Sequence, residues 1–219
     1  MTRRALIVWG GWLGHQPQEV AGIFARLLTE EGFDVQLADS LDAFRDEANL
    51  RQLHLIVPVW TMGRIEREQA EPVFRAVSQW GVGLAGCHGG MCDAFRENTE
   101  WHFMTGGQWV AHPGNDGVRY TVKIGPVKSP ITEGIDDFEV CTEQYYLHVD
   151  PAVQVLATTR FPVADGPHVP NGPVDMPVVW TKRYGAGRVF YNSLGHQASI
   201  VASEPCLTLM RRGMRWAAK

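Results

Sequence analysis

The chain has few cysteines, and none of them lies in a pattern that marks a cross-linked or zinc-bound protein. The 219 residues include four cysteines, which are widely spread and form no CxxC pair. Disulfide frameworks and structural zinc knuckles need closely spaced or regularly paired cysteines. The sequence therefore predicts reduced thiols at Cys87, Cys92, Cys141 and Cys206.

Long apolar runs and clusters of positive charge are also missing. No stretch approaches the roughly 20 apolar residues that cross a bilayer. The apolar run at residues 5–9 is too short for the core of a signal peptide and is better explained as a first strand. The formal net charge is -4, without the basic block that nucleic-acid binding needs. We therefore expect a soluble cytoplasmic protein that binds neither nucleic acid nor a membrane.

What the chain does contain is a regular alternation of strand-like and helix-like segments. Hydrophobic residues make up 45% of it, enough for the core of one domain over residues 1–219. Apolar patterns predict strands over 5–9, 33–37, 53–59 and 82–86, and helices over 17–31, 41–47, 66–80 and 205–218. Strands that alternate with helices in this way predict βαβ units and a parallel α/β sheet.

From residue 98 on, the pattern changes. An aromatic, glycine-rich and weakly periodic segment covers residues 101–113. Strands are predicted over 119–124 and 153–159, and residues 138–146 are predicted to be a strand that runs into a loop. A proline-rich surface loop follows over 161–177. Two last strands, 178–182 and 188–192, flank a glycine-containing turn and predict a hairpin.

The segment VGLAGCHGG, residues 82–90, has the composition of a strand that runs into a tight turn. Gly86 and Gly90 flank His88 at two residues on either side, which is the pattern of a nucleophile elbow. Glycines allow the sharp turn that presents the central side chain at the edge of a sheet. Either the elbow presents the imidazole of His88, or the register is shifted by one residue and it presents the thiol of Cys87.

Three histidines lie just beyond the ends of predicted strands. His15 follows the first strand, His88 the fourth, and His196 the last strand of the hairpin. Ligands of parallel sheets bind beyond the carboxyl ends of the strands, so the three imidazoles converge if these strands are neighbours. With the carboxylate of Glu143 they would suit zinc, manganese or iron with an open position. The alternative is that each is an ordinary hydrogen-bonded histidine, since no local ligand spacing such as HExxH is present.

Aromatic side chains gather in the same kind of loop. Trp12, Trp60 and Trp109 fall in loops after strands, and His112 and Tyr145 lie in segments that could reach the same edge of the sheet. Indole faces pack well on the C–H faces of sugar rings, and binding pockets combine aromatic walls with a few polar groups. We therefore expect these five residues to bind a small carbohydrate.

Cys87 is the rival candidate for the chemistry of the elbow. A thiol nucleophile needs a histidine within hydrogen-bond reach and a third group that orients this histidine. Cys87 directly precedes His88, and adjacent residues rarely face each other across a turn. The sequence favours a buried structural thiol, with a Cys87-dependent hydrolase as the alternative.

Several motifs along the chain carry a resemblance to a known family. They are WLGHQP at residues 12–17, GCHG at 86–89, GQWVAHP at 107–113, SPITEGI at 129–135, EQYY at 143–146, PVVW at 177–180, YGAGRVFY at 184–191 and GH at 195–196. Together they resemble the ThuA-like (trehalose utilisation) proteins of the class I glutamine amidotransferase-like superfamily.

This resemblance implies a flavodoxin-like, doubly wound and mostly parallel sheet with helices on both faces. In glutamine amidotransferases the elbow is GxCxG with a cysteine nucleophile, whereas His88 occupies that position here. The resemblance therefore does not extend to glutamine hydrolysis. ThuA-like proteins accompany sugar dehydrogenases that make 3-keto sugars, which implies a role in keto-sugar metabolism.

The leading hypothesis is an enzyme that acts on a sugar or 3-keto sugar, as an isomerase or a hydrolase. His88 and Glu143 would act in catalysis, and His15, His88 and His196 would bind a divalent metal such as zinc or manganese. The alternatives are a non-catalytic sugar-binding module and the Cys87-dependent hydrolase. The expected partner is a small carbohydrate, and the sequence leaves assembly into a homo-oligomer open.

Overall fold

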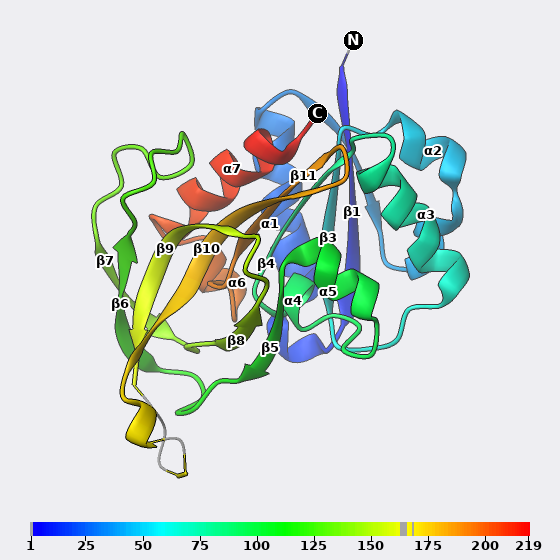
Figure 1. Ribbon diagram of the computed structural model, residues 1–219. Coiled ribbons are helices and arrows are strands. Elements are labelled where there is room, and N and C mark those ends of the chain that lie inside the picture. The colour runs from blue at the N-terminus through cyan, green and yellow to red at the C-terminus, as the bar shows by residue number, and fades with distance from the viewer. Residues whose placement is uncertain (1, 163–165, 168) are drawn as a thin grey trace.

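The structure is a computed structural model that describes residues 2–162, 166–167 and 169–219. Its centre is a nine-stranded sheet with the order β2-β1-β3-β4-β11-β10-β9-β6-β7, and a small second sheet pairs β5 with β8. Helices pack on the large sheet, and β5 lies next to the short helices α4 and α5 (Figure 1).

Five neighbouring strands form the parallel half of the large sheet. They are β1 (Arg3–Gly11), β2 (Phe33–Ala38), β3 (Leu55–Thr61), β4 (Gly83–Cys87) and β11 (Gly187–Asn192). They pair in parallel in the order β2-β1-β3-β4-β11, which is the strand order of flavodoxin-like folds. The predicted doubly wound, mostly parallel fold is confirmed, and β1, β3, β4 and β11 end at the same edge.

Antiparallel strands extend the sheet beyond β11. They are β10 (Val174–Tyr184), β9 (Gln154–Phe161), β6 (Val118–Ile124) and β7 (Phe138–Thr142), while β5 (Gly107–Ala111) and β8 (Tyr146–Val149) form the small sheet. The predicted hairpin is β10–β11. However, β10 begins inside the predicted loop 161–177, of which residues 163–165 and 168 lie outside the described residues. Pro177 is tolerated there because the β9–β10 register shifts beside it, as at a bulge.

Helices cover both faces of the sheet (Figure 1). α1 (Pro17–Glu30) and α7 (Cys206–Ala217) pack on one face, α3 (Arg67–Ser78) and α5 (Thr99–Thr105) on the other, and α2 (Glu47–Gln52), α4 (Gly89–Cys92) and α6 (Ala198–Val201) are short. Side chains alternate along β1, so Ala5 and Ile7 join the core under α1 and α7, and Leu6 and Val8 join the opposite core. None of the described helices is long and apolar enough to cross a membrane.

The contact between α7 and β11 leaves no room for a side chain at Gly213. A Cβ there would lie 2.2 Å from a ring carbon of the buried Phe190. We predict that Gly213→Ala lowers the free energy of unfolding by about 1–3 kcal/mol, because overpacking outweighs the better helix propensity of alanine. Urea denaturation followed by circular dichroism measures the change.

The matched control is Gly22→Ala in α1, where the atom nearest to an added Cβ is 3.9 Å away, on Arg26. This substitution should raise the free energy of unfolding by about 0.5–1 kcal/mol, since alanine is favoured over glycine inside a helix. Effects of the same sign and size in the two variants would contradict this packing.

Candidate functional site

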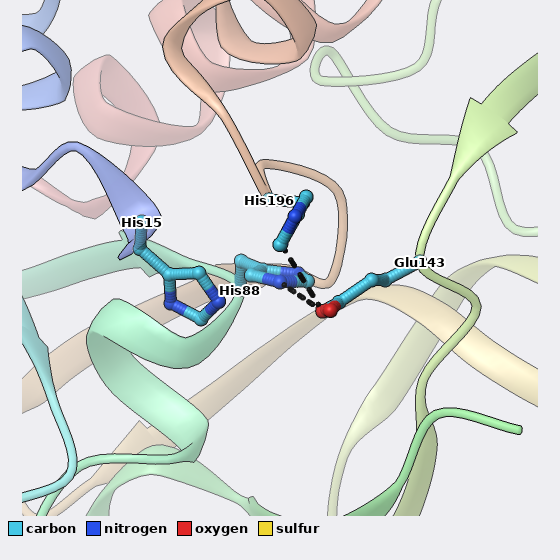
Figure 2. A group of neighbouring side chains, drawn as sticks. All are labelled: His15, His88, Glu143 and His196. Atoms are coloured by element: carbon cyan, nitrogen blue, oxygen red, sulfur yellow. Dashed lines mark hydrogen bonds and ion pairs between the residues drawn. The ribbon is translucent and has the colours of Figure 1, made fainter. Parts of the chain in front are cut away.

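Four side chains converge where the parallel strands end (Figure 2). His15 lies in the 3-10 turn Leu13–His15 after β1, His88 in the turn after β4, and His196 in the loop after β11. Glu143 follows β7, where the chain returns from the far edge of the sheet toward β8. One potential ligand atom from each residue lies within 4.8 Å of those from the other three, and all four side chains are buried.

The turn after β4 is an elbow that presents His88. The φ and ψ angles of His88 are 48° and -140°, a conformation that a non-glycine residue adopts only under strain. Gly89 follows, and a Cβ at that position would lie 2.7 Å from Cε1 of His15. A glycine is therefore required after the elbow residue for His15 and His88 to come together.

Cys87 lies in the core rather than at the elbow. Its side chain belongs to the apolar cluster under α1 and α7, and a Cβ at Gly195 would lie 2.9 Å from its Sγ. Burial raises the pKa of the Cys87 thiol well above its usual value, which disfavours the thiolate. Of the two registers that the sequence left open, the structure has the one that presents His88.

Two oxygens at strand ends orient the histidine rings. Nδ1 of His88 donates to the backbone carbonyl of Ser193 at 2.7 Å. Nδ1 of His15 lies 2.8 Å from Oγ1 of Thr61. In both rings Nε2 is then left for the centre of the cluster, and Figure 2 shows it on the side that faces Glu143.

The contact between His88 and Glu143 places two acceptors together. Nε2 of His88 lies 3.1 Å from Oε2 of Glu143. A carbonyl oxygen can only accept, so the hydrogen of a neutral His88 is on Nδ1, toward Ser193. Nε2 is then a lone pair that faces a carboxylate. The two groups repel each other unless a proton or a cation lies between them.

His196 faces the same carboxylate oxygen. Its Nδ1 lies 3.3 Å from Oε2 of Glu143. The geometry of this contact is not that of a hydrogen bond, and Nδ1 has no other hydrogen-bond partner among the described residues. Buried polar atoms without a partner are uncommon in folded proteins. Oε2 of Glu143 is thus approached by two imidazole nitrogens, one from His88 and one from His196. Neither nitrogen has an uncharged hydrogen-bond partner among the described residues.

Burial and mutual repulsion set the protonation of the cluster. Burial, together with the neighbouring His88 and His196, lowers the pKa of His15 to about 3. Burial also lowers the pKa of His88, although Glu143 opposes this shift. Burial would raise the pKa of Glu143, but its contacts with His196 and His88 outweigh burial and hold the pKa well below its usual value. The contact with Glu143 raises the pKa of His196. At neutral pH the site therefore holds a carboxylate and neutral rings at His15 and His88.

These donors fit a divalent transition metal. Neutral imidazole nitrogens and carboxylate oxygens are ligands that zinc, manganese and iron accept. A cation between Glu143 and the imidazoles would satisfy both the lone pair of His88 and the unpartnered nitrogen of His196. The buried cluster could therefore hold a metal ion.

Aromatic rings pack beside the cluster. Tyr145 stacks on His88, with ring centroids 3.9 Å apart. Trp109 and His112 lie next to Tyr145, with centroids 6.3 and 6.1 Å from its ring. Burial raises the pKa of Tyr145 well above its usual value, so its hydroxyl stays neutral. The structure thus brings three of the predicted sugar-binding residues, Trp109, His112 and Tyr145, together beside His88.

The other two predicted sugar-binding residues differ in their placement. Trp12 packs edge-on against His15, with centroids 4.7 Å apart, and remains 46% exposed. Trp60 packs instead over β1, where a Cβ at Gly10 would lie 2.5 Å from its ring. Trp12 is therefore placed at the cluster, and Trp60 on the sheet beside it.

Sequence reasoning missed several residues that support the site. Asp93 is buried, and its carboxylate accepts from Nε and Nη2 of Arg96 at 2.5 and 3.0 Å. The Arg96 guanidinium lies over the ring of Trp109, 4.5 Å from its centroid. The only sequence signal of this pair is its place in the DAFR segment after the elbow. Thr61 and Ser193 likewise have no signal beyond their position at strand ends.

The lowered pKa of His15 predicts a loss of stability in mild acid. The folded chain keeps His15 neutral to about pH 3, whereas the unfolded chain protonates it below a pKa of 6.5. The unfolded state therefore binds more protons as the pH falls from 6.5 toward 3, and the free energy of unfolding decreases over that window. With EDTA present, His15→Asn should show a smaller decrease between about pH 7 and pH 5 than the original chain.

Urea unfolding at the two pH values measures this difference. His148→Asn is the matched control, because His148 is exposed on β8, and it should keep the decrease of the original chain. The same decrease in all three proteins would show that His15 is not its source.

Comparisons with known proteins agree with this fold. The ThuA family, described as trehalose utilisation, matches residues 4–217. Among solved structures, a ThuA-like protein from Parabacteroides merdae has 17% sequence identity over 100% of this chain and 91% of that chain, with a TM-score of 0.78. A cytoplasmic protein from Salmonella typhimurium LT2 has 14% identity over 99% of this chain and 100% of that chain, with a TM-score of 0.70.

A glutamine amidotransferase from Thermotoga maritima is 11% identical over 88% of this chain and 75% of that chain, with a TM-score of 0.56. At these identities the solved structures show a shared fold alone. No curated protein sequence matches the chain. Because the trehalose-utilisation family matches nearly the whole sequence, the chain belongs to the ThuA family.

Proposed function

We propose that this chain is an enzyme of carbohydrate metabolism that acts on a sugar or 3-keto sugar at a divalent metal centre. Its ligands are His15, His88, Glu143 and His196, and zinc or manganese suits this donor set. The family match supports the carbohydrate substrate. The observation that supports the metal is the pair of imidazole nitrogens, from His88 and His196, that face one carboxylate oxygen.

At His88, a cation explains this arrangement better than a proton does. Nδ1 of His88 already donates to Ser193, so only an imidazolium could also donate to Glu143. Burial lowers the pKa of His88, which opposes the imidazolium. A neutral ring with its lone pair at Nε2 is what a metal ligand requires.

In this proposal Glu143 accepts a proton from the substrate. A bound divalent metal supplies Lewis acidity, which polarises a carbonyl and acidifies the C–H beside it. Oε2 of Glu143 faces the imidazoles, whereas Oε1 lies 3.7 Å from Nε2 of His112. The lowered pKa of Glu143 keeps it ionised but makes it a weak base, so it can remove a proton only from an acidified C–H.

His112 would carry the proton onward. Its side chain is 29% exposed, and its Nδ1 has no hydrogen-bond partner in the described part of the chain. Return of that proton to the former carbonyl carbon, while the hydroxyl proton passes from one enediol oxygen to the other, isomerises a 3-keto sugar. In a 3-keto glycoside the enolate instead expels the leaving oxygen from C1, which takes up the proton, and water then adds its hydroxyl to C1 and its hydrogen to C2 of the resulting double bond. Both reactions begin with proton transfer to Glu143, so the same site serves an isomerase or a hydrolase.

Trp12 offers the sugar a stacking surface. Trp12 is 46% exposed and its ring makes a T-shaped contact with the ring of His15, so part of the side chain is accessible beside the proposed metal centre. Trp109, His112 and Tyr145, which lie together beside His88, would also contact the sugar. A sugar-binding module would use the same rings without turnover.

We predict that His88→Ala weakens zinc binding by roughly 100-fold or more and abolishes turnover of a 3-keto sugar, because it removes a ligand that is held in place by Ser193. Calorimetric titration of the EDTA-treated chain with zinc or manganese measures binding, and NMR of the sugar measures turnover. Cys87→Ser, one residue away, is the matched control and should retain both.

Each other result favours a different function. Unchanged zinc affinity in His88→Ala would exclude the metal centre. Loss of turnover in a well-folded Cys87→Ser would favour the thiol hydrolase. A chain that binds the sugar but never turns it over would favour the sugar-binding module.

We predict that Trp12→Ala raises the KM for the sugar by about 3–10-fold with little change in kcat, because ring stacking is lost while the metal centre is kept. Phe103→Ala is the control, since Phe103 is an exposed aromatic residue on α5 that the site does not use. Steady-state kinetics of both variants measures the effect, and an unchanged KM in Trp12→Ala would exclude stacking on this ring.

A further inference from the structure

The connection between β5 and β6, residues 112–117, contacts the cluster at both of its ends. Near its start, Nε2 of His112 lies 3.7 Å from Oε1 of Glu143. Near its end, Oδ2 of Asp116 lies 3.9 Å from Nε2 of His196. This one loop thus lies beside both Glu143 and His196, two of the four residues assigned to the metal centre.

The backbone of this loop holds Asp116 in a defined orientation. Gly114, Asn115 and Gly117 have positive φ angles of 91°, 55° and 86°, so the chain turns tightly around the aspartate. Oδ1 of Asp116 accepts from the backbone N–H of Gly117 at 2.9 Å. Oδ2 is therefore the oxygen that faces His196.

The ring of His196 is turned so that Nδ1 faces Glu143 and Nε2 faces Asp116. The other two histidines of the cluster each use their second ring nitrogen to contact an oxygen, a threonine hydroxyl in one case and a backbone carbonyl in the other. Histidines that bind metals almost always make such a contact, because the outer acceptor fixes the ring and raises the basicity of the ligand. For His196 the carboxylate of Asp116 occupies that position.

We propose that Asp116 is a positioning residue of the metal centre, which accepts the Nε2–H of His196 and thereby directs Nδ1 toward the ion. This inference rests on the proposed function, because it concerns the same site. The separation of 3.9 Å is longer than a hydrogen bond. A small movement of the loop or one bridging water completes the contact.

A role in folding alone does not account for this contact. The side chain of Asp116 is 51% exposed, and ion pairs this exposed contribute little to the stability of a fold. Removal of its charge should therefore leave the metal-free chain intact and act on metal binding.

The test is Asp116→Asn in the full chain, titrated with zinc and with cobalt after EDTA treatment. Loss of the outer carboxylate should weaken zinc binding about 10–100-fold, as measured by calorimetry against a competing chelator. It should also shift the visible absorption of bound cobalt, because His196 becomes a weaker donor. Urea unfolding of the metal-free chain should not change. Asp116→Glu keeps the carboxylate and should recover most of the zinc affinity.

Asp34→Asn is the matched control. Asp34 lies on β2, its Oδ2 is 3.9 Å from Nε of Arg4, and its side chain is 63% exposed. The substitution therefore removes the same charge from an equally long contact of another exposed aspartate, one that involves none of the four ligands. Its zinc affinity should equal that of the original chain.

The outcomes separate this inference from the proposed function. Weaker zinc binding in Asp116→Asn alone supports the role of Asp116. Equal zinc affinity in all three proteins overturns that role and leaves the metal centre in place. Equal weakening in both variants also overturns it, since the effect would then be one of net charge. A chain that binds neither zinc nor cobalt overturns the metal centre and the role of Asp116 with it.

Discussion

The hydrogen bond from His88 to the backbone of Ser193 is the interaction on which the site depends. It connects the ends of two neighbouring parallel strands, β4 and β11, and determines which nitrogen of His88 carries the hydrogen. With that hydrogen on Nδ1, the lone pair on Nε2 is directed at Glu143. A buried carboxylate and a neutral imidazole then lie together in a geometry that a cation, rather than a simple ion pair, makes favourable.

The sheet maintains this geometry against local strain. A φ of 48° at His88 costs on the order of 1–3 kcal/mol for a residue with a side chain. The neighbouring strand offsets this cost, because the backbone N–H of His88 donates to Asn192 at 2.7 Å and the Tyr191 hydroxyl donates to the His88 carbonyl at 3.1 Å. The elbow is thus held by the sheet, with the imidazole of His88 presented at its edge.

Short-range patterns were enough to predict four strands of the parallel half of the sheet. The shared edge of parallel strands then predicted that the three histidines meet if their strands are neighbours, and the pairing of β11 with β4 makes them so. Glu143 was proposed only as a carboxylate beside Tyr145 and Tyr146. No short-range pattern places it at the cluster, because it follows β7 at the far edge and is anchored by a long-range bond from the Tyr120 hydroxyl to its carbonyl at 2.9 Å. The helix α5 was missed although Asn98 caps it and Gly106 ends it, since a helix of two turns shows too little periodicity. The pairing of β5 with β8 and the contact of Asp116 with His196 also join distant segments, and no local pattern specifies them.

The four central side chains come from positions 15, 88, 143 and 196, so nearly the whole length of the chain must be in place before they form one site. In a zinc finger, a bound ion organises one short loop. Here the free energy released by an ion would instead be linked to closure of the entire sheet, since no short fragment contains all four donors. Local opening at any one of these segments would release the ion. Occupancy would therefore report on the cooperativity of the whole fold, from its first strand to its last.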